Sequence, residues 1–503
     1  MNSAVFDSIK AFLDAVGVFY IIYLIGYSTF LFLSVVVGSS TLYQRRRQEK
    51  LKNTIADHYH VPVSIIVPAY NEEVTVVETV KSLLQLEYQA YEIIVVDDGS
   101  KDNTSKVLID AFGLTPIQRP IRKRLRCMPE DFICESSQHK VPITLIRKKN
   151  GGKADTLNMG INISNFPYFI CMDADSVLQY DSLRKIVRPI LENDHVVAVG
   201  GTIRASNSVE LKDGRVIKYR LPKNILACMQ VLEYDRSFLA SRILFDKFNG
   251  SLIISGAFGL FKKDVVIAAG GYDATTMGED MELVVKLHEY CVMNEMPYLI
   301  KYATDAICWT QAPEKLRDLK KQRRRWHLGL FQSMLKHRRM FFNLKYGLVS
   351  FISYMYFLIY ELLSPYIEIF GILTMVLAFL VDLLNVPFML LFFAVYAVFG
   401  SFLSLTAFFA RIQTIDLTLK FTDILKAVFL CFFEIVFLRF VLAFAIVLQI
   451  TVSLGFVHGV IAPITPNGPI STRVKPLSPD HAVVVISSVP GVFSATSTCF
   501  KIL

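Results

Sequence analysis

Pairs of acidic residues are the groups in this sequence best suited to chemistry. Asp97 and Asp98 directly follow one apolar, β-rich run, and Asp173 and Asp175 follow another. Such runs predict buried strands, and ligands bind at the carboxyl ends of strands in open α/β sheets. Paired carboxylates there can hold Mg²⁺ or Mn²⁺ against a diphosphate, whereas each pair alone could equally cap a turn.

A third acidic strand end carries Tyr70 and Glu72, just after Pro68. Three such ends in one crevice repel one another unless a cation or hydrogen-bond donors lie between them. Lys153 follows two glycines at the start of a helical segment, where it could bind phosphate groups. Together these residues favour a nucleotide-and-metal site over three independent turns, although Lys153 alone could be an ordinary surface lysine.

Two further motifs could complete such a site. Glu279 and Asp280 open a strongly helical segment, where a carboxylate stays ionised and could serve as a general base or only as a helix cap. Gln322, Arg325 and Trp326 are spaced i, i+3 and i+4, so they share one helix face. They could bind a diphosphate and cover a pocket, or they could form a tryptophan and arginine patch at a membrane interface.

The composition places this chemistry beside a membrane. The mean hydropathy of +0.42 is high for a soluble enzyme, and long apolar runs occupy residues 16–38 and 346–461. About 20 apolar residues in a helix cross a bilayer core, so both runs can span it. The eight cysteines form no CxxC pair, which favours reduced, cytosolic thiols.

The formal net charge of +9 is concentrated beside the apolar runs. No RNA-binding or zinc-finger pattern accompanies it, so nucleic acid is not expected as a partner. Juxtamembrane Lys and Arg mark the cytoplasmic side and attract anionic lipids, so we expect membrane lipids as partners and a cytosolic catalytic domain. The basic clusters comprise Arg45, Arg46, Arg47, Lys50 and Lys52 after the first run, and Lys320, Lys321, Arg323, Arg324, Arg325, Lys336, Arg338 and Arg339 before the second.

From Val61 onward, short β-rich runs alternate with helical segments, which predicts a parallel α/β sheet. The stretch 113–141 has three prolines and no clear period, so we expect a surface insertion there. Expected strands cover 63–67, 92–96, 143–146, 168–172, 196–203, 251–261 and 298–308. The predicted organisation is a transmembrane helix at 15–38, a cytosolic domain at 62–310, an amphipathic interfacial helix at 311–345, three or four spans at 346–461 and an unstructured tail at 462–503.

The order of the motifs resembles that of a known family. Asp-Asp-Gly, Asp-x-Asp, Glu-Asp and Gln-x-x-Arg-Trp occur in sequence and precede the membrane spans, as in the processive family-2 glycosyltransferases, which include cellulose, hyaluronan, chitin and poly-N-acetylglucosamine synthases. The resemblance covers residues 62–340 in motifs and the remainder in architecture only. It implies an α/β GT-A catalytic domain with a helical transmembrane bundle, and an inverting hexosyltransferase that uses Mg²⁺ or Mn²⁺ and a UDP-sugar donor.

The resemblance also implies a role for each motif residue. Asp280 would be the general base, and Asp175 would ligate the metal together with Asp173. The acceptor would lie against Ser255, Gly256, Glu279 and Trp326. The nucleotide sugar would be bound by Tyr70, Glu72, Asp97, Asp98, Lys153, Asp173, Gln322, Arg325 and Trp326.

Departures from the family pattern leave the product open. The sequence has Gly-Glu-Asp where cellulose synthases have Thr-Glu-Asp, and Ser255-Gly256-Ala257 replaces their Phe-Cys-Gly. The favoured product is a growing β-linked polysaccharide, with or without its passage through the membrane helices. Transfer of one sugar to a lipid carrier or glycolipid is the first alternative. A transporter or an inactive scaffold is the other, but it leaves the acidic strand ends unexplained.

Overall fold

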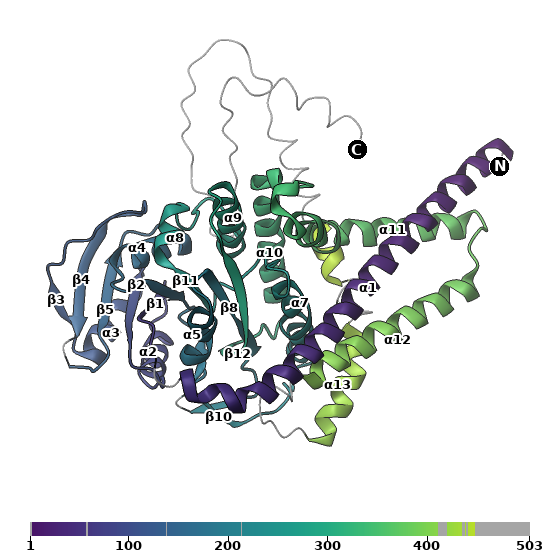
Figure 1. The fold of residues 1–503 in the computed structure, drawn as a ribbon. Coiled ribbons are helices and arrows are strands. Elements are labelled where there is room, and N and C mark those ends of the chain that lie inside the picture. Colours follow the sequence, from purple (N-terminus) through teal and green to yellow (C-terminus); the bar gives the residue numbers. More distant parts are fainter. Residues whose placement is uncertain are drawn as a thin grey trace, which may run out of the picture. The chain divides into compact units, whose positions relative to one another are not determined.

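A ten-stranded mixed sheet carries the acidic motifs at its strand ends (Figure 1). The computed structural model describes residues 3–56, 59–136, 138–212, 214–410, 420–434, 438 and 441–447. The strand order is β3-β4-β5-β2-β1-β6-β11-β8-β12-β7. The strands are β1 (Val63–Ala69), β2 (Tyr91–Asp97), β3 (Thr115–Ile117), β4 (Glu130–Ser136), β5 (Ile143–Lys148), β6 (Tyr168–Cys171), β7 (Val177–Leu178), β8 (Val196–Ala205), β11 (Gly259–Lys262) and β12 (Leu299–Thr310).

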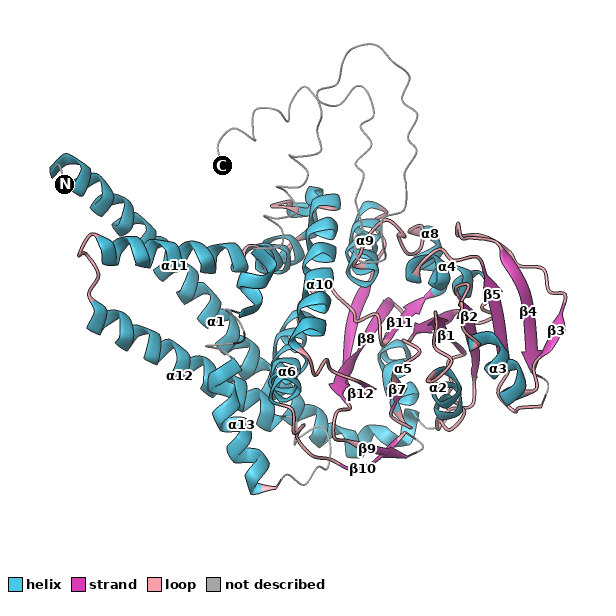
Figure 2. Ribbon diagram, turned by 180° about the vertical axis from the view of Figure 1, so that it is seen from behind, coloured by secondary structure: helices cyan, strands magenta, loops and turns pink. Residues whose placement is uncertain are grey.

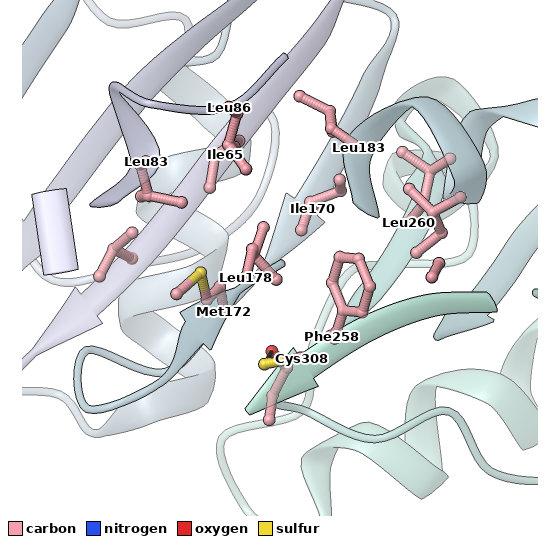
Figure 3. Close-up of a cluster of buried hydrophobic side chains, with 14 of the residues drawn as sticks. Ile65, Leu83, Leu86, Ile170, Met172, Leu178, Leu183, Phe258, Leu260 and Cys308 are labelled. Carbon is pink, nitrogen blue, oxygen red and sulfur yellow. Dashed lines mark hydrogen bonds between the residues drawn. The ribbon is translucent and has the colours of Figure 1, made fainter. Parts of the chain in front are cut away.

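Helices cover both faces of the sheet, so the central strands β1 and β2 are buried along almost their whole length and are mostly apolar (Figure 2). Ile65 packs with Leu83 and Leu183 on one face (Figure 3), whereas its neighbour Ile66 packs with Leu157 on the other. This alternation follows from the two-residue period of a strand. The helices of the two faces are α2 (Val76–Leu83), α3 (Thr104–Phe112) and α5 (Ser182–Glu192) on the first, and α4 (Lys153–Ile163), α8 (Lys263–Ala268) and α9 (Glu279–Met293) on the second.

The sheet is mixed, so the prediction of a parallel sheet is only partly right. The strands β5, β2, β1 and β6 are parallel neighbours, but β11 lies antiparallel between β6 and β8. The segment 113–141 contributes β3 and β4, which extend the sheet beyond β5 instead of forming an irregular surface insertion. The sequence did not predict these edge strands. An edge strand buries little of its surface, so polar residues and prolines are tolerated there and the apolar pattern of a strand is lost. Of the strand expected at 251–261, only β11 forms.

Long apolar helices follow and precede the sheet domain. Helix α1 (Ser3–Ala56) is much longer than the predicted span, and α12 (Val386–Ala410) lies within the region 346–461 where spans are predicted. The helical turns η4 (Val349–Tyr354) and η5 (Phe357–Leu362) are joined to α11 (Ser364–Leu380) by a 50° bend just before Pro365. Within the described residues, two helices can span a membrane, or three if the bent pair is one span.

The sheet domain and the apolar helices are joined by α6 (Ile225–Arg236), η1 (Ser237–Ser241), α7 (Arg242–Asp246) and α10 (Leu316–Lys336). Helix α6 packs against α12 and α13 (Phe421–Phe433), and η1 packs against α1. The remaining short elements are a two-stranded ladder, β9 (Glu210–Lys212) with β10 (Arg215–Lys218), and the turns η2 (Arg338–Met340) and η3 (Leu344–Tyr346). The mixed sheet and the apolar helices confirm the predicted fold class at the level of an α/β domain with helices that are long and apolar enough to span a membrane. The predicted tail at 462–503, and most of the predicted span beyond residue 434, lie outside the described residues.

Candidate active site

The parallel register of β1, β2 and β6 brings the acidic strand ends to one edge of the sheet. Ala69 at the end of β1 is level with Asp97 at the end of β2, and Cys171 of β6 is level with Ile66. Asp173 follows the end of β6 by two residues and therefore reaches the same edge of the sheet. The expectation that these carboxylates share one crevice thus agrees with the register of the strands.

Asp97 is fully buried and shapes the turn after β2. Its carboxylate accepts hydrogen bonds from the Ser100 amide at 2.8 Å and from the Ser105 hydroxyl, and it lies 3.8 Å from the Arg147 guanidinium. The neighbouring carboxylate of Glu72 instead accepts a 2.6 Å hydrogen bond from Thr75. Both acids therefore define the shape of their turns in addition to any contact with a nucleoside.

The turn that carries Tyr70 is attached to the turn after β2. The amide of Asn71, which has a left-handed φ of 58°, donates to Ser100 Oγ at 3.0 Å, and the amide of Glu72 donates to Thr104 Oγ1 at 2.9 Å. The ring of Tyr70 is 44% exposed at the rim of these turns. It is therefore free to stack on a planar group such as a base.

Asp98 holds the glycine loop that precedes α4. Its Oδ1 accepts from the Gly151 amide at 2.9 Å and its Oδ2 from the Gly152 amide at 2.8 Å. The fully buried Lys148 ammonium pairs with Asp98 and, at 2.7 Å, with Asp155. Asp98, Lys148 and Asp155 form what we call the loop anchor. The sequence predicted Asp98 in the nucleotide site, and the structure places its carboxylate on the loop that presents Lys153.

The loop anchor contains two residues that the sequence did not single out. Lys148 lies in the run Arg147-Lys148-Lys149, which suggests three exposed charges. Only the alternation of β5 decides that the middle one points inward, since Arg147 is half-buried and Lys149 is exposed. Asp155 also accepts from the amide of Met128 at 3.1 Å, which ties the 113–141 segment to the anchor.

Lys153, Asp173, Glu279 and Asp280 form a second group, which we call the reaction cluster. Lys153 Nζ lies 2.5 Å from Asp173 Oδ1 and 3.5 Å from Glu279 Oε1. The Gly256 amide donates to Asp280 Oδ2 at 3.0 Å, and a Cβ at Gly256 would lie only 3.3 Å from Lys153 Nζ. The structure thus brings together predicted donor, acceptor and base residues from four separate segments.

The reaction cluster is electrostatically unbalanced, with three carboxylates around one ammonium. Burial lowers the pKa of Lys153, but the charges of Asp173, Glu279 and Asp280 outweigh burial and raise that pKa overall. Burial raises the pKa of Glu279, and Asp280 adds to the increase while Lys153 opposes it. Perturbed pKa values of this kind are characteristic of functional sites.

Asp280 occupies the first turn of α9, where the helix dipole favours a negative charge. Its second oxygen, Oδ1, accepts from the Met281 amide at 2.8 Å. Ser255 is half-buried and precedes the Gly256 contact, and the Ser255 hydroxyl accepts from the Ala257 amide at 3.4 Å. In the irregular loop 251–258, the backbone bends so that the Gly256 amide points to Asp280.

Helix α10 packs directly on the acidic turn at residues 278–280. Gly278 and Gly329 meet so closely that a Cβ on Gly278 would lie 2.9 Å from Gly329 Cα. The Met277 amide also donates to Gln332 Oε1 at 2.8 Å. Trp326, which is 46% exposed, lies one helical turn before this contact.

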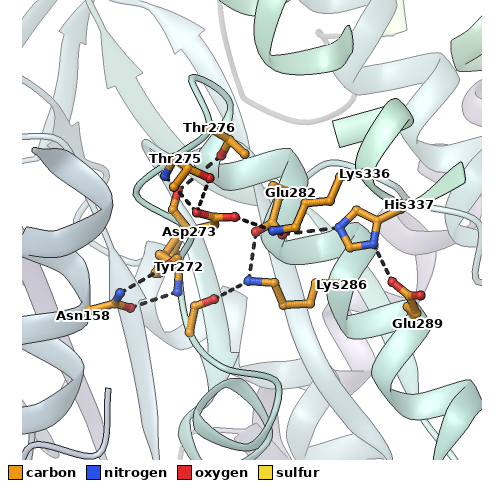
Figure 4. A network of polar contacts seen from close by, with 11 residues as sticks. Asn158, Tyr272, Asp273, Thr275, Thr276, Glu282, Lys286, Glu289, Lys336 and His337 are labelled. Atoms are coloured by element: carbon orange, nitrogen blue, oxygen red, sulfur yellow. Dashed lines mark hydrogen bonds and ion pairs between the residues drawn. The ribbon is translucent and has the colours of Figure 1, made fainter. Parts of the chain in front are cut away.

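Further along α10, a network of charges joins this helix to α9 (Figure 4). Fully buried Glu282 accepts from Lys336 at 2.5 Å, pairs with Lys286 at 2.9 Å and contacts His337 at 3.3 Å. Lys336 also pairs with Asp273 in the loop that leads to Asp280. The sequence did not identify this network, because its members lie on two helices that are adjacent only in the folded chain.

The residues predicted to bind a diphosphate on α10 differ in exposure. Arg325 is exposed. Gln322 is half-buried, and its Oε1 is buried without a hydrogen-bond partner among the described residues. A polar atom left in that state is expected where a ligand completes the site.

Asp175 is the residue most suited to a metal. Its side chain is exposed, yet desolvation by the surrounding protein raises its pKa and the charge of Asp173 raises it further. A divalent cation would remove both penalties, and carboxylate oxygens are preferred ligands of Mg²⁺ and Mn²⁺. Within the described part of the chain, no three metal-ligating side chains converge on one point, so a cation held here would need diphosphate oxygens as additional ligands.

Comparison with known proteins gives a consistent assignment. Residues 168–458 match the sequence profile of Glycosyl transferase family group 2, and residues 64–126 match Glycosyl transferase family 2. Poly-beta-1,6-N-acetyl-D-glucosamine synthase of Staphylococcus epidermidis strain RP62A is 30% identical over 322 residues, which are 62% of this chain and 66% of that protein. The synthase of Staphylococcus aureus strain COL is 30% identical over 323 residues, with the same coverage. The match therefore spans 66% of the length of these curated relatives.

Among solved structures, the mannosyltransferase PcManGT from Pyrobaculum calidifontis, in complex with GDP-Man and Mn²⁺, is similar with a TM-score of 0.49 and 18% identity. That comparison covers 78% of this chain and 98% of the mannosyltransferase. The family profile covers more than half of the sequence, including α10 and, of the reaction cluster, Asp173, Glu279 and Asp280. This agrees with the resemblance drawn from the motifs, and the chain belongs to Glycosyl transferase family group 2.

Proposed function

We propose that this protein is a membrane-bound, inverting hexosyltransferase that adds sugar from a UDP-sugar to a growing β-linked polysaccharide at the cytosolic membrane face. The named relatives are polysaccharide synthases, which supports a polymeric product. The single observation that carries the mechanism is the reaction cluster, in which a candidate base, Asp280, lies within one group with Lys153 and Asp173.

Each member of the cluster has a distinct task in the proposal. Asp280 accepts the proton of the acceptor hydroxyl as the new bond forms, and the Gly256 amide and the start of α9 keep its carboxylate oriented and ionised. Lys153 stays protonated and places a positive charge beside the departing diphosphate. Asp173 orients the Lys153 ammonium at 2.5 Å.

A divalent cation fits this proposal as the partner of Asp175, with Asp173 beside it. Bound Mg²⁺ or Mn²⁺ would supply charge stabilisation for the UDP leaving group. Tyr70 and Glu72 would then contact the nucleoside, beside the turn that the buried Asp97 shapes. Gln322, Arg325 and Trp326 would approach from α10 toward the diphosphate and the acceptor. Ser255 and Glu279 would line the acceptor side, next to Gly256.

The location follows from the apolar helices and the charge beside them. Arg45 follows the apolar part of α1 and donates to the Tyr302 carbonyl and to Thr304, both at 3.1 Å. The catalytic domain is therefore attached to the basic end of that helix, which the positive-inside rule assigns to the cytosol.

The test is direct. The purified, detergent-solubilised protein is incubated with a panel of radiolabelled UDP-sugars and Mg²⁺ or Mn²⁺, and any product is sized and digested with linkage-specific glycosidases. We expect a polymer from one donor and no product in EDTA. A single-sugar glycolipid would favour lipid glycosylation instead, and transfer that persists in EDTA would contradict the role of the metal.

A further inference from the structure

Arg323 is a charged residue of α10. It lies between the predicted binding residues Gln322 and Arg325 in the sequence, but it was not predicted to bind a ligand. Its guanidinium pairs with Glu233 of α6 through two parallel contacts, Nη1 to Oε1 and Nη2 to Oε2, each 2.6 Å long. Both side chains are largely shielded, with 14% of Arg323 and 24% of Glu233 exposed. The Arg323 guanidinium is therefore bound within the protein, whereas Arg324 and Arg325 beside it are exposed.

The same guanidinium stacks on Trp326. The Arg323 Cζ lies 4.5 Å from the centre of the Trp326 ring. A planar guanidinium whose two outer nitrogens are both bonded to one carboxylate has a fixed orientation, which a lysine ammonium cannot reproduce. The indole thus rests on a surface whose plane Glu233 determines.

Helix α6 is a firm support for this arrangement. Leu319, one turn before Arg323, packs in an apolar cluster with Met229 and Leu232 of α6. At the end of α6, Arg236 donates to Glu434 at 2.7 Å and to Ser404 at 2.6 Å. These contacts of α6 fix the position of Glu233 without the help of its ion pair with Arg323.

We propose that Glu233 and Arg323 are positioning residues that hold the Trp326 indole in the orientation in which it meets the acceptor sugar. The inference rests on the proposed function for the role of Trp326, but the positioning itself is a property of the free protein. It does not require either residue to contact a substrate.

The chain provides its own spectroscopic probe. It has two tryptophans, of which Trp309 is 1% exposed and Trp326 is 46% exposed. Acrylamide, a neutral quencher, therefore reports mainly on Trp326, and Trp326→Phe should remove the readily quenched fraction. We expect Glu233→Gln and Arg323→Lys to change the quenching constant of Trp326 by about two- to fivefold, the population change that one exposed cation–π contact corresponds to.

A matched control is present elsewhere in the fold. Arg215 pairs with Glu87 at 2.5 Å and stacks over the Tyr180 ring at 3.9 Å, so it repeats the same three-residue arrangement without a tryptophan. Glu87→Gln and Arg215→Lys should leave the quenching of Trp326 and the rate of transfer unchanged. If these controls alter both quantities as strongly as the Arg323 variant does, the proposed specificity is wrong.

Enzyme kinetics separates positioning from folding. We expect Arg323→Lys to lower kcat for transfer about tenfold, with KM for the UDP-sugar changed by less than about threefold and more donor lost to hydrolysis. The exchanged pair Glu233→Arg with Arg323→Glu restores the ion pair but places a carboxylate against the indole. It should recover thermal stability without recovering transfer or quenching.

Two further outcomes would overturn the inference. One is unchanged quenching in both Glu233→Gln and Arg323→Lys, whatever their activity. The other is full recovery of transfer in the exchanged pair, because that would make the contact purely structural. Failure of the proposed role of Trp326 looks different: Trp326→Ala would then leave transfer intact, while Glu233→Gln and Arg323→Lys would still change the quenching of Trp326. Failure of the proposed function would be the absence of transfer in the wild-type protein, again with these quenching changes present.

Discussion

The loop anchor and the reaction cluster lie at the two ends of the same short loop, yet they treat charge in opposite ways. In the loop anchor, both oxygens of Asp98 accept hydrogen bonds from backbone amides, and Oδ1 also pairs with the buried Lys148. In the reaction cluster, one half-exposed lysine faces three carboxylates, and the pKa values of Lys153 and Glu279 are both raised. The polar groups of the loop anchor find their partners within the protein, whereas the reaction cluster has an excess of negative charge.

This difference separates the two ways in which a mutation can abolish activity. Residues of the anchor determine where Lys153 is presented, so their loss should act first on stability. Residues of the cluster have interactions that a ligand would complete, so their loss should act first on rate or binding. The predictions below test that division, beginning with the largest expected effect.

Asp280→Asn should lower kcat for transfer by about 10²–10⁴-fold, which is the usual contribution of a general base. Asparagine keeps the shape of the side chain and can still accept from one of the two amides, that of Gly256 or that of Met281, but it cannot take a proton. UDP affinity, measured by calorimetry, should stay within about threefold of wild type. Loss of UDP binding with normal turnover at saturating donor would make Asp280 a helix cap and not a base.

Lys148→Met should destabilise the protein by about 3–5 kcal/mol, because it leaves two buried carboxylates without their cation. The measurement is the denaturation midpoint of the detergent-solubilised enzyme. Lys149→Met changes the exposed neighbour and should have little effect. Adding Asp98→Asn to Lys148→Met should recover part of the loss, and a stable Lys148→Met protein with impaired transfer would move the anchor into the group that acts on rate.

Gly329→Ala tests how closely α10 must approach the reaction cluster. The new Cβ would lie 2.6 Å from the Cα of Gly278, and both neighbours are backbone, so the helix has to move. Overpacking of this kind costs about 1–3 kcal/mol, and transfer should fall with it. Gly17→Ala, in a helix with no atom within 4 Å of the new Cβ, is the matched control and should be neutral. Normal transfer by Gly329→Ala would show that α10 need not touch the acidic turn.

The acidic strand ends could be predicted from the sequence because two local signals coincide there. An apolar run of strand length followed directly by carboxylates identifies both the strand and its functional end, as for Asp97 and Asp173. The start of α4 at Lys153 was also predicted, since two glycines precede a regular helical pattern. In each case the information lies within a few residues of the site.

The interactions that hold the site together could not be predicted in this way. Burial of Lys148 depends on the pleat of β5, and the contact of Glu282 with Lys336 depends on how α9 and α10 pack. The strand predicted at 251–261 was also too long, because the irregular segment before β11 has the same apolar composition as a strand. A single sequence records which residues are apolar or charged, but not which distant charges become neighbours.

The final prediction concerns Asp175, where the cluster opens to solvent. Because the folded protein raises the pKa of this carboxyl, its contribution to stability is present at low pH and is lost as the pH rises through the folded value. Asp175→Asn should therefore raise the melting temperature of the metal-free protein slightly at pH 8, and the difference should vanish below about pH 4, near the ordinary pKa of an aspartate. Asp194→Asn, at an aspartate whose side chain is 94% exposed, should show no such trend.

Adding Mn²⁺ and UDP reverses the order of stability in this prediction. A ligand at about 100 times its Kd stabilises the folded state by about 2.7 kcal/mol, so wild type and Asp194→Asn should both gain in melting temperature. Asp175→Asn should gain little, because the carboxylate that would hold the cation is gone. An equal gain in Asp175→Asn would place the cation elsewhere, and the only interaction of Asp175 with the reaction cluster would then be its repulsion by Asp173.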